Sequence, residues 1–125
     1  MEKMNPSDKL EDFLFYLEEV KKEYEENFAI VGEEDRRLQD YLHALEFAPN
    51  KQERNKVATQ FQQSRRRRRK DKDKVMELEK VYDFQKDQAN RPVLKRLKAT
   101  ITQQKGNEQF LAGPREYKKR VGDTK

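Results

Sequence analysis

Apolar residues recur along the first part of the chain with the spacing of an amphipathic helix. Gaps of three or four residues separate Leu10, Phe13, Leu17, Val20, Tyr24, Phe28 and Val31. The same row continues in phase beyond Gly32, at Leu38, Leu42 and Leu45. A new helix that followed a loop would not have to keep this phase. We therefore predict one helix over residues 6–47, and whether Gly32 is a kink or a turn stays open.

The first clear break in this pattern lies at Ala48-Pro49-Asn50. Proline disfavours a helical conformation at the residue before it, so the first helix has to end near residue 47. Asn50 followed by Glu53 is typical of a capping box at a helix start. A second heptad-like row follows, apolar at its two ends and polar in its middle. These features predict a second helix over residues 51–89.

Pro92 marks the start of the last segment with helical periodicity. Its apolar stripe consists of Val93, Leu94, Leu97 and Ile101. This stripe predicts a third helix over residues 92–105, because Lys105-Gly106 is a typical helix stop. Residues 106–125 contain Gly113-Pro114 and several cations, and we expect them to form a flexible basic tail.

These elements predict the all-α fold class. Two long helices of similar length joined by a short turn indicate a long antiparallel, coiled-coil-like hairpin, with the third helix packed across its open end. We expect residues 1–105 to form a single helical domain. The expected core residues are Phe13, Leu17, Tyr24, Phe28, Phe61, Val75, Leu78 and Tyr82. Because two helices leave much of each apolar row uncovered, we also expect a homo-oligomer.

The composition fits such a narrow fold better than a wide globular core. Charged residues make up 42% of the chain and hydrophobic residues 33%, so little apolar surface is available to offset chain entropy. Disorder is the competing interpretation, but the apolar residues are periodic rather than scattered. The chain has no cysteine, no apolar run of membrane-spanning length and no apolar N-terminal signal segment. We expect a soluble, cytoplasmic protein without a membrane partner.

Charge is distributed very unevenly along the chain. Residues 1–47 carry 14 acidic and 6 basic side chains, whereas residues 48–125 carry 10 acidic and 23 basic ones. The densest cationic segment lies in the second predicted helix and consists of Arg65, Arg66, Arg67, Arg68, Arg69, Lys70, Lys72 and Lys74. These candidate nucleic-acid-binding residues would contact phosphates without reading base sequence. Alternatively, acids within residues 23–35 could pair with the arginines that face them and fix the register of the hairpin.

Residue types that carry catalysis or bind metals are sparse. His43 is the only histidine, and Ser7 and Ser64 are the only serines, with no base placed to activate either of them. The four glycines form no phosphate-binding loop. We therefore predict a non-enzymatic protein with no catalytic residues, no metal site and no cofactor.

Three segments carry a resemblance to a known group of proteins. Residues 39–47 (Gln-Asp-Tyr-Leu-His-Ala-Leu-Glu-Phe), then Glu53-Arg54 and the arginine run with Lys70-Asp71, resemble small uncharacterised helical proteins of Firmicute bacteriophages. The resemblance implies a phage accessory protein inside an infected bacterial host, and it brings no known activity with it.

Two functional hypotheses follow from these patterns. The first is binding of DNA or RNA through the cationic segment, and the second is a protein–protein adaptor or inhibitor. In the second, the charged helical faces would dock a host or phage protein, and the acidic first helix could mimic a nucleic acid.

Overall fold

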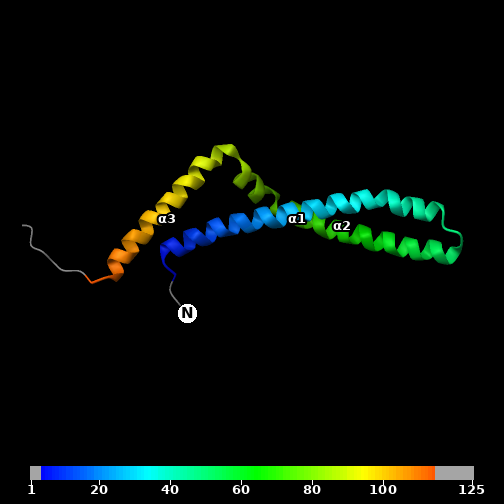
Figure 1. Ribbon diagram of the computed structural model, residues 1–125, viewed down its shortest axis with the longest axis horizontal. Helices are drawn as coiled ribbons and strands as arrows, with labels where there is room; N and C mark the ends of the chain where they lie inside the picture. Colours follow the sequence, from blue (N-terminus) through cyan, green and yellow to red (C-terminus); the bar gives the residue numbers. More distant parts are fainter. Residues whose placement is uncertain (1–3, 115–125) are drawn as a thin grey trace, which may run out of the picture.

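Three long helices make up most of the chain in the computed structural model, which describes residues 4–114 (Figure 1). α1 spans Pro6–Glu46, α2 spans Lys51–Lys86 and α3 spans Arg91–Ala112, and a short 3₁₀ helix, η1, spans Gln88–Asn90. No strand occurs within the described residues. The predicted all-α fold class is therefore confirmed, and α1 and α2 pack against each other as the expected hairpin.

α1 is one continuous helix of 41 residues, about 60 Å long at 1.5 Å per residue. Its first turn is fixed by Asn5, whose N–H donates to the Asp8 carboxylate at 3.0 Å. Pro6 occupies the first helical position, where its missing N–H leaves no hydrogen bond unmade. Gly32 lies inside the helix and does not turn the chain, so the prediction of a single helix is confirmed.

The hairpin turn forms where the sequence predicts it, but α2 is shorter than expected. The Asn50 Oδ1 atom accepts a hydrogen bond from the Glu53 N–H at 2.8 Å, which caps the start of α2. The predicted end of this helix at residue 89 is wrong, because Asp87 adopts an extended conformation with φ −63° and ψ 124°. The Asp87 carboxylate accepts from the Ala89 N–H at 2.9 Å, and this local turn separates α2 from α3.

α3 is longer than the sequence predicts. It continues through Gly106 to Ala112, so the predicted end at residue 105 is wrong. The predicted tail over residues 106–125 therefore begins too early, since residues 106–112 are helical. The last part of that tail, residues 115–125, lies outside the described residues.

Contacts with α1 explain why α3 passes through Gly106. A glycine in a helix interior costs about 1 kcal/mol relative to alanine. Contacts between α3 and α1 offset this cost. Lys105 Nζ lies 2.8 Å from Glu11 Oε1. The Glu108 carboxylate also accepts hydrogen bonds from the Ser7 N–H, at 3.0 Å, and from the Ser7 hydroxyl. We call these four residues the clasp, and they hold the C-terminal part of α3 against the start of α1.

α1 packs against two different helices along its length. Toward the hairpin turn it lies beside α2, and its N-terminal end lies beside α3. Figure 1 shows the end of α2 turning away from α1 and α3 running back to the beginning of α1. The buried apolar side chains are Leu17, Val20, Val31, Val75, Leu78 and Ile101. The core is thus a narrow seam rather than a central cluster.

The expected core is confirmed only in part. Leu17, Val75 and Leu78 are buried, and Tyr24, Phe61 and Tyr82 are half-buried. The assignments of Phe13 and Phe28 are wrong, since these side chains are 42% and 60% exposed. Gln85, near the end of α2, contacts Glu18 at 3.0 Å. Phe13 lies closer to the start of α1 than Glu18 does, so α2 ends before it could cover Phe13. The Phe28 ring stacks on Tyr24 at 5.9 Å and stays at the edge of the seam.

Candidate nucleic-acid interface

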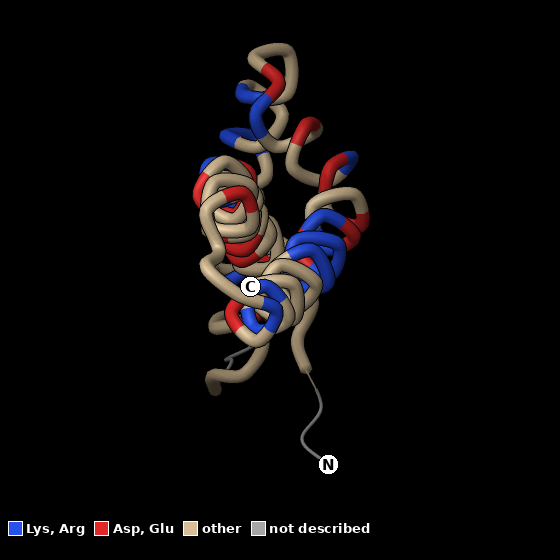
Figure 2. Tube along the Cα trace, turned by 90° about the vertical axis from the view of Figure 1, so that its right-hand side faces the viewer, with Lys and Arg blue, Asp and Glu red and all other residues tan. Residues whose placement is uncertain are grey.

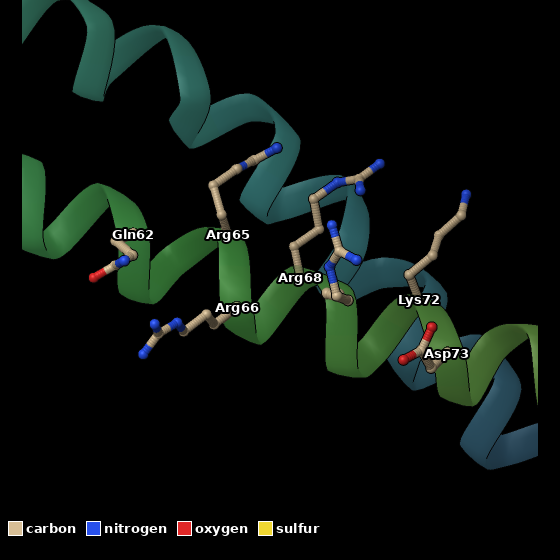
Figure 3. Close-up of a pocket in the computed structure, with 7 residues that line it drawn as sticks. Gln62, Arg65, Arg66, Arg68, Lys72 and Asp73 are labelled. Carbon is tan, nitrogen blue, oxygen red and sulfur yellow. The ribbon is translucent and has the colours of Figure 1, made fainter.

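The five consecutive arginines of α2 point in different directions, because successive residues of a helix are rotated by about 100°. The hairpin divides the predicted cationic residues into two sets. The inner arginines, which contact α1, are Arg65, Arg67 and Arg68. The outer cations, which are exposed, are Arg66, Arg69, Lys70 and Lys72. Figure 3 shows Arg65 and Arg68 reaching toward α1, whereas Arg66 points away from it.

The inner arginines bind two adjacent acids of α1. The Arg68 Nε atom donates a hydrogen bond to Asp35, which also lies 3.8 Å from Arg65 Nη2. Arg65 Nη2 further donates to the Glu34 backbone carbonyl at 3.1 Å. The hydrogen bond from Arg68, helped by the charges of Arg65 and Lys72, lowers the pKa of Asp35 below its ordinary value. Arg65 and Arg68 of α2 therefore hold Asp35 of α1 in its charged form.

A buried carboxylate lies at the centre of these contacts. Glu34 is only 4% exposed, and its Oε2 atom accepts a hydrogen bond from the hydroxyl of Ser64, which is fully buried. Arg37 Nη1 and Arg67 Nε lie 3.3 and 3.6 Å from the other carboxylate oxygen. Buried charges are tolerated in proteins when they are paired and hydrogen-bonded, as this one is. We call Glu34, Asp35, Ser64 and the inner arginines the polar layer, and it fixes the register of α1 against α2.

The outer cations remain available to an external partner. None of the four forms an ion pair with any residue in the described part of the chain. A shallow groove of about 530 Å³ follows this side of α2 (Figure 3). The residues that line this basic groove are Gln62, Arg65, Arg66, Arg68, Arg69, Lys72 and Asp73. Lys74, the last predicted cation, is half-buried, and its Nζ atom lies 3.7 Å from Glu77.

The opposite charge accumulates on α1. Figure 2 shows Lys and Arg gathered on α2 and Asp and Glu on α1, along the hairpin. A second groove of about 320 Å³, lined by Glu19, Lys22, Glu23 and Glu26, lies on the outer surface of α1. The alternative prediction, that acids of residues 23–35 pair with the arginines, holds for Glu34 and Asp35. Within the described residues, Glu23 and Glu26 form no ion pair.

Neither a metal site nor a membrane-spanning helix is found among the described residues. Across residues 4–114, no three His, Cys, Asp or Glu side chains come together as they would to hold a metal ion. His43 Nδ1 lies 3.9 Å from Glu46, its neighbour one turn along the same helix. None of the described helices is both long and apolar enough to cross a membrane.

Comparison with known proteins adds no family to this picture. No protein-family model matches the chain, and no curated protein or solved structure matches it either. The resemblance to small phage proteins therefore stays a prediction.

Proposed function

We propose that the protein binds nucleic acid without base-sequence preference, through the basic groove and Lys70. The observation that carries the proposal is the exposure of the outer cations, which have no counter-ion among the described residues. Such cations gain most from phosphate contacts, because binding releases the counterions condensed on the nucleic acid. Arginine also suits phosphate, since its planar guanidinium donates two parallel hydrogen bonds.

The geometry limits how many phosphates the groove can contact. Of the eight predicted binding residues, the three inner arginines and Lys74 already face carboxylates. Four cations remain, and they would neutralise about four phosphates. The logarithm of the binding constant should then fall with the logarithm of salt concentration with a slope of about −3.6 for duplex DNA and about −2.8 for a single strand. Between ~50 and ~200 mM salt, duplex affinity should fall by about two orders of magnitude.

The test is a salt series with fluorescently labelled duplex DNA and RNA, followed by fluorescence anisotropy. The variant Arg66→Gln/Arg69→Gln/Lys72→Gln should lose most of the binding and most of the salt slope. The control Arg91→Gln/Lys95→Gln/Arg96→Gln removes the same charge from exposed positions of α3 and should bind nearly as well as the wild type. Equal loss in both variants would show that only net charge matters, and absence of binding at low salt would overturn the proposal.

A second candidate function is docking of a basic protein, as an adaptor or inhibitor, on the acidic side of the hairpin. Exposed Glu19, Glu23 and Glu26 favour it, because they follow one side of α1 with no cation but Lys22 in their groove. The variant Glu19→Gln/Glu23→Gln/Glu26→Gln separates the candidates. It should leave nucleic-acid binding intact and abolish capture of a basic polypeptide. Equal capture by this variant and by the wild type would remove this candidate.

A further inference from the structure

Each long helix carries a second row of residues in heptad spacing that the hairpin does not use. The acidic row of α1 consists of Asp12, Tyr16, Glu19, Glu23, Glu26 and Ile30. The basic row of α2 consists of Gln62, Arg66, Arg69, Asp73, Met76 and Lys80. All twelve side chains are exposed. In both rows the residues are separated by gaps of four, three, four, three and four positions, which is the spacing of a seam between helices.

Apolar side chains lie within both rows although water surrounds them. Tyr16 is 47% exposed and Ile30 39%, and Met76 is 72% exposed. Aromatic residues, methionine and arginine, all of which these rows contain, are enriched at protein–protein contact surfaces. The two rows carry opposite charges, so each is complementary to the other. They cannot meet within one chain, because each lies on a side of its helix that is turned away from the hairpin seam.

We propose that the acidic row of α1 docks on the basic row of α2 in a second copy of this chain. In an antiparallel alignment every position of one row falls opposite a position of the other when their residue numbers add up to 92. This alignment places Glu23 opposite Arg69 and Glu26 opposite Arg66. Two ion pairs therefore form at the centre of the interface.

One end of the rows agrees with the same alignment, whereas at the other end Ile30 falls opposite Gln62. Asp12 falls opposite Lys80, and Tyr16 falls opposite Met76, where a thioether and an aromatic ring pack favourably. One pair opposes association, since Glu19 falls opposite Asp73. The interface is therefore held by three ion pairs and one apolar contact, against one like-charge contact.

The position of the rows determines the form of the assembly. At about 100° per residue, the acidic row lies about a quarter turn from the side of α1 that faces α2. The basic row lies on the far side of α2, so the two rows point in different directions. One partner cannot cover both rows of a chain. Two copies in contact therefore leave the basic row of one copy and the acidic row of the other uncovered. The contact is head-to-tail, so it builds a closed ring of hairpins if the rotation between copies closes and an open-ended chain if it does not.

This inference stands independently of the proposed nucleic-acid binding. Arg66 and Arg69 belong to both surfaces, so a second copy and a nucleic acid would compete for them. Glu23 and Glu26 lie outside the basic groove. Variants of these two acids therefore test self-association and leave the basic groove unchanged.

The experiment is sedimentation velocity of the full chain over a concentration series, at low and at high salt. The wild type should form larger species as concentration rises, and salt should dissociate them. Glu23→Gln/Glu26→Gln and Arg66→Gln/Arg69→Gln should each be monomeric, with unchanged helicity by circular dichroism. An equimolar mixture of the two variants should form only a heterodimer, because each contributes one intact row. The control Asp40→Asn/Glu46→Gln removes two exposed acids outside the row and should associate as the wild type does.

Asp73→Asn gives a test in the opposite direction. Removing the like charge opposite Glu19 should lower the dissociation constant of self-association several-fold. A wild type that stays monomeric at every concentration would overturn the proposal. So would oligomers that the Glu23→Gln/Glu26→Gln variant still forms, or a mixture of the variants that stays monomeric.

Discussion

Replacing Ser64 by alanine tests whether the polar layer holds the hairpin together. Ser64 is fully buried, and its hydroxyl donates to Glu34, whose side chain is almost completely shielded from water. In the Ser64→Ala variant water cannot take the place of the lost donor, so one carboxylate oxygen stays buried without it. A hydrogen bond to a charged group contributes about 1.5–3 kcal/mol. Arg37 and Arg67 still face the other oxygen, so we expect a loss near the lower limit, about 1.5–2 kcal/mol.

Urea unfolding followed by circular dichroism measures this loss. With an m-value of about 1–3 kcal/mol/M, the midpoint should fall by roughly 1 M at unchanged m. The control is Thr59→Ala, which removes an exposed hydroxyl that donates to Asn55 O at 3.0 Å in the same helix. It should cost less than about 0.5 kcal/mol. A Ser64→Ala variant as stable as this control would refute the reasoning.

The double variant Glu34→Leu/Ser64→Ala removes both buried polar partners at once. Replacing a buried polar pair by apolar groups of similar size is often neutral or stabilising, because no charge then has to be desolvated. We expect stability close to that of the wild type, and therefore a strong coupling between the two positions. If the double variant lost as much as the two single variants together, the two side chains would be independent.

Two further changes have defined outcomes. Gly32→Ala should raise the free energy of unfolding by about 0.5–1 kcal/mol, because Gly32 lies in a helix interior and an added Cβ would meet only Arg36 Nη1, at an ordinary 3.6 Å. Thermal denaturation should therefore show a higher melting temperature for the variant. A lower melting temperature would contradict the helical packing at Gly32. The hydrogen bonds from Ser7 lower the pKa of Glu108 below its ordinary 4.5, so its contribution to holding α3 is complete above that value and is lost as pH falls through the folded pKa. Amide exchange within residues 104–112 should therefore accelerate in acid relative to the hairpin, beyond the intrinsic pH effect, and Glu108→Gln should remove this pH dependence.

The sequence predicts the hairpin well because its signals are local. The phase of apolar residues across Gly32 indicates one helix, and the helix-breaking proline at Pro49 marks its end without knowledge of any distant contact. The two acids that pair with the inner arginines also lie in the stretch expected to face them. In each case, neighbouring residues carry the information that fixes the structure.

The remaining features depend on contacts between distant parts of the chain. α3 passes Gly106 because the clasp joins residues 101 positions apart, which no local pattern reveals. Phe13 looks like a core residue from its spacing, but α2 turns away before reaching it. The division of the cationic segment into inner and outer sets likewise requires the position of α1, since five consecutive arginines surround their own helix.

The separation in sequence between contacting residues increases steadily from the hairpin turn toward the start of α1, and this gradient predicts an order in which the chain folds. The Ser64–Glu34 contact closes 30 residues, Tyr82–Glu25 closes 57, Gln85–Glu18 closes 67 and the clasp closes 101. Loop closure costs more entropy as the loop lengthens, but each contact that forms shortens the next loop. We therefore expect the two helices to close progressively from Pro49 outward and α3 to dock last. We expect the clasp to be the first part of the described structure to open.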